Sequence, residues 1–251
     1  MRHWAKNLKF NRVPDMVAFK SVQKLSAMLN SAMARSSFGI DAIFRLPAAI
    51  FFGLLAFSVV RGLVMFILQW STLDIPYKPL RLAAIVANAL FLFTLLSLTV
   101  LRSKPVKSST TLSARLMAII GTCLPLSLGL LPLADLPPVV TLISIVMIGS
   151  GCGLAIWTAF WLGRSFSVAP QARRLVIGGA YSVVRHPLYL CEELAVLGAM
   201  LSCFSTVAVA IAVIHWSFQL KRMEFEEQVL SATFPEYASY AATVPRLIPR
   251  W

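Results

Sequence analysis

Charged side chains are scarce in this sequence. Only 13% of its 251 residues are Asp, Glu, Lys or Arg, whereas a typical soluble domain has about 25%. By contrast, 58% of the residues are hydrophobic and the mean hydropathy is +0.78. A chain of 27.6 kDa cannot bury that much apolar surface in a water-soluble core. This composition excludes an ordinary soluble domain and predicts a membrane protein.

Acidic residues are especially few. Ten Asp and Glu stand against 23 Lys and Arg, which gives a formal net charge of +13. Nucleic-acid-binding proteins are often this basic, but here the basic residues flank apolar runs, as they do in loops that face anionic lipid. We therefore expect contact with an anionic lipid surface and no nucleic-acid partner.

Cysteine offers no site. The four cysteines lie in or beside apolar runs, and no two have the spacing of metal ligands; they are Cys123, Cys152, Cys191 and Cys203. Neither a disulfide framework nor a zinc site is supported, so no metal site is predicted.

Residues 1–39 form a basic, acid-poor segment. Between residues 18 and 33 the apolar residues recur at spacings of four and three, which predicts an amphipathic helix suited to a membrane surface. An Arg- and Ser-rich leader of this kind is also compatible with an organelle transit peptide.

Four apolar runs follow, each of about the 20 residues that a membrane-spanning helix needs; they are residues 46–70, 82–101, 116–134 and 138–162. Basic residues gather in the 102–115 loop and in the 163–187 stretch. By the positive-inside rule, these two segments and the N-terminus are expected in the cytoplasm.

The apolar run 194–220 has two interpretations. As one span it carries the basic C-terminal region across the membrane, whereas as a hairpin with arms 188–201 and 206–220 it returns that region to the cytoplasm. The charge balance favours the hairpin. The predicted fold is thus an all-α polytopic membrane bundle with about four full spans, a C-terminal helical hairpin and a cytoplasmic amphipathic N-terminal helix. Its expected parts are residues 1–39, spans 1–3 within 40–135 and a core at 136–251.

Two polar stretches contain the candidate site residues. In RHPLY (185–189), His186 precedes a proline that is suited to open a helix, so the imidazole is either a ligand contact or an interfacial anchor. Gly178 and Gly179, just upstream, allow close backbone approach or form a turn. In the second stretch, Arg222 and Glu226 are an i, i+4 pair on one helical face.

Six motifs in this order resemble the family of isoprenylcysteine carboxyl methyltransferases and phospholipid methyltransferases, which are integral membrane enzymes. They are LGRSF (162–166), RRLVxGGAY (173–181), RHPLY, RxxxEExxL (222–230), FPEYxxY (234–240) and PRLIP (245–249). The resemblance covers roughly residues 140–250. The sequence departs from the family at Phe234-Pro235, where the family has Phe-Gly.

The resemblance implies that S-adenosylmethionine binds at the cytoplasmic face. The implied cofactor-binding residues are Arg173, Arg174, Leu175, Val176, Tyr181, His186, Pro187, Leu188, Tyr189 and Glu226, and the implied substrate-binding residue is Arg222. Gly151 and Gly153 match a further Gly-x-Gly of the phospholipid branch, although such a pair in an apolar helix is also typical of helix packing.

The activity implied is methyl transfer from S-adenosylmethionine to a lipophilic acceptor in the membrane. If the acceptor is a carboxylate, Arg222 holds it, His186 holds the carboxylate of the cofactor and no general base is needed. If the acceptor is a lipid amine, a proton must leave, and Glu226 or Glu227 is the candidate base. The catalytic candidates are therefore Arg222, Glu226 and Glu227.

Two other functions are compatible with the composition. A membrane reductase of the sterol or steroid type resembles this family in its C-terminal bundle and would use Arg173 and Arg174 for the 2′-phosphate of NADPH. A transporter or scaffold would place charges in several spans, and beyond Arg61 the spans offer almost none.

Overall fold

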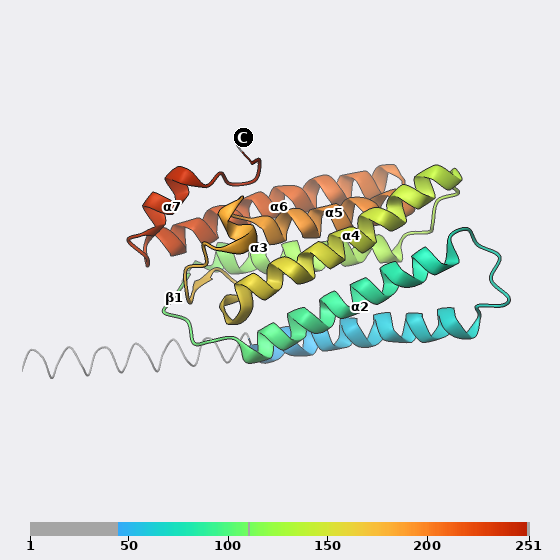
Figure 1. Cartoon of the computed structure of the whole chain (residues 1–251), viewed down its shortest axis with the longest axis horizontal. Coiled ribbons are helices and arrows are strands. Elements are labelled where there is room, and N and C mark those ends of the chain that lie inside the picture. The colour runs from blue at the N-terminus through green and yellow to red at the C-terminus, as the bar shows by residue number, and fades with distance from the viewer. Residues whose placement is uncertain (1–44, 110, 250–251) are drawn as a thin grey trace, which may run out of the picture. The chain divides into compact units, whose positions relative to one another are not determined.

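The computed structural model describes residues 45–109 and 111–249 (Figure 1). The segment 1–39, with its predicted helix at 18–33, lies outside these residues. The helices are Arg45–Leu68, α2 (Lys78–Leu101), α3 (Leu112–Cys123), α4 (Pro138–Leu162), α5 (Pro187–Ser202), α6 (Thr206–Ser231) and α7 (Tyr237–Thr243). Short 3-10 turns are η1 (Leu124–Leu130), η2 (Gly163–Ser165) and η3 (Gly179–Ser182), and the strands are β1 (Lys107–Ser108) and β2 (Gln171–Ala172).

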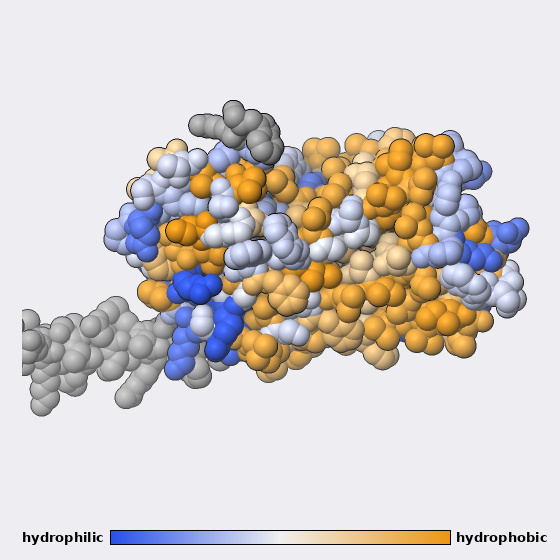
Figure 2. All heavy atoms as spheres, viewed as in Figure 1, coloured by the Kyte–Doolittle hydropathy of each residue, from blue (hydrophilic) through white to orange (hydrophobic). Residues whose placement is uncertain are grey.

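The predicted all-α membrane bundle is confirmed. Four helical segments are long and apolar enough to cross a membrane; they are Arg45–Leu68, Lys78–Leu101, Leu112–Leu130 and Pro138–Ser165. Figure 2 shows a broad apolar surface between two more polar ends, which is the pattern that a hydrocarbon layer requires.

The third span differs from its predicted bounds of 116–134. Its α-helix begins at Leu112 and ends at Cys123, after which the chain continues as the 3-10 turn η1 to Leu130. Pro125 has no N–H to donate, so the regular α-helical hydrogen bonding cannot pass through it. The apolar pattern alone did not indicate this change of geometry.

The helical hairpin is also confirmed, and the single span at 194–220 is excluded. A turn of three residues separates Ser202, at the end of α5, from Thr206, at the start of α6. Ser205 caps α6, because its hydroxyl accepts a hydrogen bond from the Ala208 N–H at 3.2 Å. With 26 residues against 16, α6 is ten residues longer than α5, or about 15 Å at 1.5 Å per residue.

The predicted cytoplasmic segments that the structure describes meet at one end of the bundle, which we call the loop end (residues 102–109, 111, 163–186 and 232–249). There β1 pairs antiparallel with β2, and the Arg185 N–H donates to the Pro245 carbonyl at 2.9 Å. In Figure 1, α7 and β1 lie at this same end. The two polar stretches of the sequence are therefore brought together.

The α4–α5 contact depends on small residues. A Cβ atom added to Gly151 would lie 2.6 Å from the backbone nitrogen of Ala195, and one added to Gly198 would lie 2.9 Å from Ile148. By contrast, a Cβ at Gly153 would meet nothing within 4 Å. Gly151 therefore has the packing role typical of small residues between membrane helices, and Gly153 does not.

Gly151→Ala is expected to separate α4 from α5 and to lower thermal stability in detergent, by about 1–3 kcal/mol for overpacking. The melting temperature is measured by monitoring the folded fraction with size-exclusion chromatography. Gly153→Ala is the matched control, since it adds the same methyl group to the same helix in open space. Equal melting temperatures for the two variants would contradict this role for Gly151.

Candidate functional site

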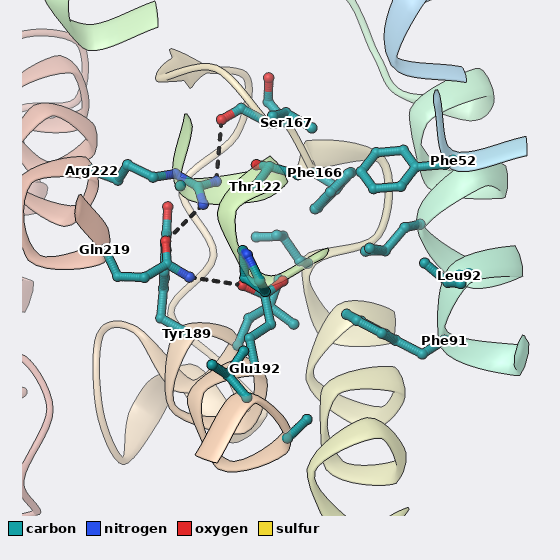
Figure 3. Close-up of a pocket in the computed structure, with 18 of the residues that line it drawn as sticks. Phe52, Phe91, Leu92, Thr122, Phe166, Ser167, Tyr189, Glu192, Gln219 and Arg222 are labelled. Atoms are coloured by element: carbon teal, nitrogen blue, oxygen red, sulfur yellow. Dashed lines mark hydrogen bonds between the residues drawn. The ribbon is translucent and has the colours of Figure 1, made fainter. Parts of the chain in front are cut away.

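A cavity of about 290 Å³ lies inside the bundle. Its lining comes from helix Arg45–Leu68, α2, α3 with η1, α4, α5 and α6, together with the loop before β2. Two walls differ in character. One is apolar and carries Phe51, Phe52, Phe91, Leu92 and Leu95 from the first two helices. The other is polar and belongs to α5 and α6, and Figure 3 shows the two walls facing each other.

The polar wall follows one face of α6. Its members are spaced four, three and four residues apart, which places them along one stripe of a helix; they are His215, Gln219, Arg222 and Glu226. We call this set the α6 stripe. Eleven residues of helix correspond to about 16 Å, so polar groups run deep into an otherwise apolar interior.

Arg222 lies at the centre of the stripe and is buried. Its Nη1 donates to the Gln219 side-chain oxygen at 2.7 Å, its Nη2 donates to the Val168 carbonyl at 3.4 Å, and its guanidinium lies 5.2 Å from the centre of the Tyr189 ring. Its Nε is buried and has no hydrogen-bond partner within residues 45–109 and 111–249. A buried donor of this kind is costly unless a ligand satisfies it.

Gly121 of α3 makes the space that Arg222 occupies. A Cβ atom there would lie 2.9 Å from the Cδ of Arg222. A larger residue at position 121 would therefore push the guanidinium out of place, although α3 contributes no charged group to the cavity.

Glu226 and Arg222 lie on one face of α6, as their i, i+4 spacing predicted, but they form no ion pair with each other. Glu226 instead accepts a hydrogen bond from the Tyr189 hydroxyl at 3.1 Å. Tyr189 thus stands between the carboxylate and the guanidinium, and it holds both in place. Pro187 opens α5, as the sequence predicted, and so fixes the direction of Tyr189 two residues later.

Glu227 is the centre of a second cluster at the loop end. Its carboxylate lies 2.9 Å from His186 Nε2, 3.2 Å from Arg185 Nε and 2.8 Å from Arg246 Nη2. Partial burial alone would raise the pKa of this carboxyl, but the hydrogen bonds from His186 and Arg246 and the nearby positive charges lower it to about 2. Glu227 therefore ties α6 to both the RHPLY segment and the C-terminal segment.

The C-terminal segment also reaches the site through Tyr181. The Tyr240 hydroxyl of α7 donates to the Tyr181 carbonyl at 2.6 Å, so the departure at Phe234-Pro235 does not prevent α7 from covering this residue. Burial raises the pKa of the Tyr181 phenol well above its usual range. Tyr181 thus offers a neutral hydroxyl to the cavity that it lines.

Gly179 lies against another part of the protein, the Trp161 ring of α4, and not against an open cavity. Its φ is +61°, a conformation that favours glycine, and an added Cβ would lie 2.1 Å from the Trp161 ring. Gly178 has ordinary extended backbone, and its nearest such contact is 3.9 Å away. The close approach that the sequence allowed at this pair is therefore a contact with α4.

Gly179→Ala is expected to displace the loop before RHPLY and to lower the melting temperature, because the left-handed conformation costs about 1–2 kcal/mol and the ring must also move. Gly178→Ala is the adjacent control and should change the melting temperature little. Limited proteolysis of the 163–186 loop measures the displacement. Equal protection in both variants would contradict the expectation.

The predicted site residues, for cofactor, substrate and catalysis, fall into two groups. Those that line the cavity are Tyr181, His186, Leu188, Tyr189, Arg222 and Glu226. Those outside the lining are Pro187, Glu227 and the segment Arg173, Arg174, Leu175 and Val176. Arg173 is buried and donates to the Gln171 side chain, whereas Arg174 is exposed.

Three polar residues that α5 and α6 contribute to the cavity were not among the predicted site residues. They are Glu192, His215 and Gln219. The helical spacing from Arg222 back to Gln219 and His215 was visible in the sequence, but Gln219 and His215 lie within the apolar run 194–220, which hydropathy assigns to the membrane. Only the structure shows that this face of α6 looks into a cavity.

Comparison with known proteins identifies the part of the chain that holds this site. Residues 139–237 match the phospholipid methyltransferase family. The matched segment is 99 of the 251 residues of the chain. It begins in α4 and ends at the start of α7, so it contains the polar wall of the cavity but not the apolar wall.

Individual relatives match a similar length. The chain is 35% identical over 94 residues to protein-S-isoprenylcysteine O-methyltransferase B of Arabidopsis thaliana, which is 35% of this chain and 48% of that protein. It is 32% identical over 97 residues to cobalt-zinc-cadmium resistance protein CzcN of Cupriavidus metallidurans, which is 38% of this chain and 42% of that protein. The match therefore spans less than half the length of each relative.

Proposed function

We propose that this protein is an integral membrane methyltransferase that moves a methyl group from S-adenosylmethionine to a lipophilic acceptor carrying a carboxylate or an amine. The observation that carries the proposal is the cavity itself. It has the α6 stripe with the buried Nε of Arg222 on one side and aromatic side chains on the other. Such a cavity suits a ligand with a polar reactive end and a long apolar body.

The residues at the loop end of the cavity fit the cofactor. Tyr181, Tyr189 and Glu226 offer hydroxyl and carboxylate groups to its polar parts. His186 Nε2 is engaged by Glu227, so a contact between His186 and the cofactor carboxylate would fall to Nδ1. Pro187, Leu188 and the segment Arg173, Arg174, Leu175 and Val176 enter the proposal on the family resemblance.

When bound, S-adenosylmethionine supplies a methyl group on a positively charged sulfur, which a nucleophile displaces. The protein has to align the acceptor and exclude water. Arg222 is held by Gln219 and Tyr189 and would orient a carboxylate acceptor. For an amine acceptor, Glu226 lines the cavity and would take the proton, whereas Glu227 is outside the cavity lining and would act by holding His186.

The proposed topology is multi-pass, with both termini and the site in the cytoplasm. The basic residues of the 102–111 and 163–186 loops support it, because they gather at the loop end. At the same end we propose contact with an anionic lipid surface.

The test is incubation of membranes that contain the protein with methyl-labelled S-adenosylmethionine. Label that mild base releases as methanol indicates a carboxyl ester, and base-stable label in lipid indicates an amine. Titration of the purified protein with S-adenosylmethionine and with NADPH separates this proposal from a reductase. Binding of NADPH alone, or no transfer with any membrane fraction, would contradict the proposal.

A further inference from the structure

Glu192 gives the cavity a carboxyl group that the proposed function does not use. It projects from α5 onto the polar wall, and Figure 3 shows a line of hydrogen bonds from Arg222 through Gln219 to Glu192. Asn88 and Cys152, from α2 and α4, line the same cavity. Among the described residues that line the cavity, Arg222 of the α6 stripe is the fixed positive charge.

The neighbouring Glu193 has the close hydrogen-bond partner that a buried structural carboxyl group needs. Glu193 is buried and contacts His215 Nδ1 at 3.0 Å. Glu192, in contrast, receives one hydrogen bond within the described residues, from the neutral amide of Gln219, and that bond is long at 3.3 Å. A carboxylate has about four acceptor positions, so most of the capacity of Glu192 is left for a ligand.

Gln219 also separates Glu192 from the positive charge of Arg222. Its oxygen accepts from Arg222 Nη1, so its amino group must turn toward Glu192. Arg222 donates to Gln219 and Val168 rather than to Glu192. Leaving aside the two histidines, which face Glu227 and Glu193, the ionisable groups of the cavity lining that are acids or fixed cations are Arg222, Glu192 and Glu226, so two carboxyl groups share one guanidinium.

From this arrangement we infer that Glu192 is a specificity-determining residue, which selects acceptors with an alkylammonium group on a long apolar chain. The ammonium would donate to Glu192, and the chain would lie against Phe52, Phe91 and Leu92. A carboxylate acceptor would place a third carboxyl group in a cavity lined by one guanidinium and would lose affinity. The inference rests on the proposed function only in treating this cavity as the acceptor site.

The test uses two probes with the same chain, tetradecylamine and tetradecanoate, and the purified full-length protein in a neutral maltoside detergent without cofactor. Binding is followed by isothermal titration calorimetry. We expect the amine to bind the wild-type protein roughly tenfold or more tightly than the carboxylate, because a charge-assisted hydrogen bond in an apolar site has this effect.

Glu192→Gln is expected to lose at least about tenfold in affinity for the amine and to leave the carboxylate within about threefold. Glu224→Gln is the matched control, because Glu224 is on α6, is exposed and pairs with Lys221. It should keep the wild-type preference. Tighter or equal binding of tetradecanoate by the wild-type protein overturns the inference, even if Glu192→Gln does not fold. An unchanged preference in a folded Glu192→Gln protein overturns it too.

A separate titration with S-adenosylmethionine distinguishes this inference from the proposed function. If the wild-type protein binds the amine preferentially but does not bind S-adenosylmethionine, the proposed function fails and the role of Glu192 stands. If it binds S-adenosylmethionine without a preference for the amine, the proposed function stands and the role of Glu192 fails.

Discussion

Glu227→Ala is expected to detach the C-terminal segment from the bundle and to abolish any activity of the site. The substitution leaves Arg185, His186 and Arg246 without their shared carboxylate, and like charges then lie close together. Removal of one partner from a partly buried charged cluster of this size costs about 2–4 kcal/mol. The measurements are the melting temperature in detergent and the rate at which protease cleaves after residue 231.

The control for this variant is Glu224→Ala, which removes an exposed salt bridge from the same helix and should change stability by less than about 1 kcal/mol. Arg246→Ala should reproduce part of the proteolytic sensitivity, since it removes the C-terminal partner alone. If all three variants were equally protected from protease, Glu227 would not be the anchor of this segment.

The pH dependence of this anchor has a definite sign. The pKa of Glu227 lies at about 2 in the folded protein, below its ordinary value of 4.5. Its stabilising contribution is therefore fully present above pH 4.5 and is lost as the pH falls toward 2. Protease protection of the C-terminal segment should follow this range in the wild-type protein and should lose this pH dependence in Glu227→Ala.

Glu226→Gln and Arg222→Ala are expected to separate the two proposed binding functions. Glu226→Gln removes the carboxylate that we propose binds the cofactor, so S-adenosylmethionine binding should fall below detection. Arg222→Ala should spare cofactor binding and weaken the binding of a carboxylate acceptor, which Arg222 would contact through its buried Nε. Calorimetric titration of each variant with S-adenosylmethionine measures the first effect, and the dependence of methyl transfer on acceptor concentration measures the second.

Arg222 also contacts Tyr189 and Gln219, so its replacement needs a control for structure. Arg222→Lys keeps the charge but loses the planar guanidinium that lies over Tyr189, and it should restore stability without restoring full acceptor binding. Equal loss of cofactor affinity in Glu226→Gln and Arg222→Ala would contradict the division of roles.

Much of the fold was predictable because a helix that spans the bilayer needs about 20 consecutive, mostly apolar residues. The bounds of α4 follow directly from its apolar run, and the helical hairpin follows from charge balance, although its turn was predicted at residues 202–205 and lies at 203–205. The change to 3-10 geometry at η1 was not predictable from hydropathy, because it depends on the backbone at Pro125. The sequence also left open whether Gly151 packs against a helix or lets a ligand approach the backbone. Only the position of Ala195 shows that it packs against a helix.

The site was predictable at its loop end, where motif and charge coincide at His186, Tyr189 and Glu226. Its interior was not. Glu192 and Gln219 lie in runs that hydropathy assigns to the membrane. Whether their side chains point into the cavity depends on how α5 and α6 pair. The first two helices supply the aromatic wall but lie outside residues 139–237, so no motif indicated that Phe52 or Phe91 would face Arg222.

The extra length of α6 relative to α5 has a kinetic consequence. Because the ten additional residues carry the charged part of the site past the start of α5, a water-soluble methyl donor and a lipid-dissolved acceptor would approach the same cavity from different phases. The rate of such an enzyme would follow the mole fraction of acceptor in the bilayer rather than its bulk concentration. Diluting the acceptor with inert lipid at constant total acceptor should therefore slow turnover.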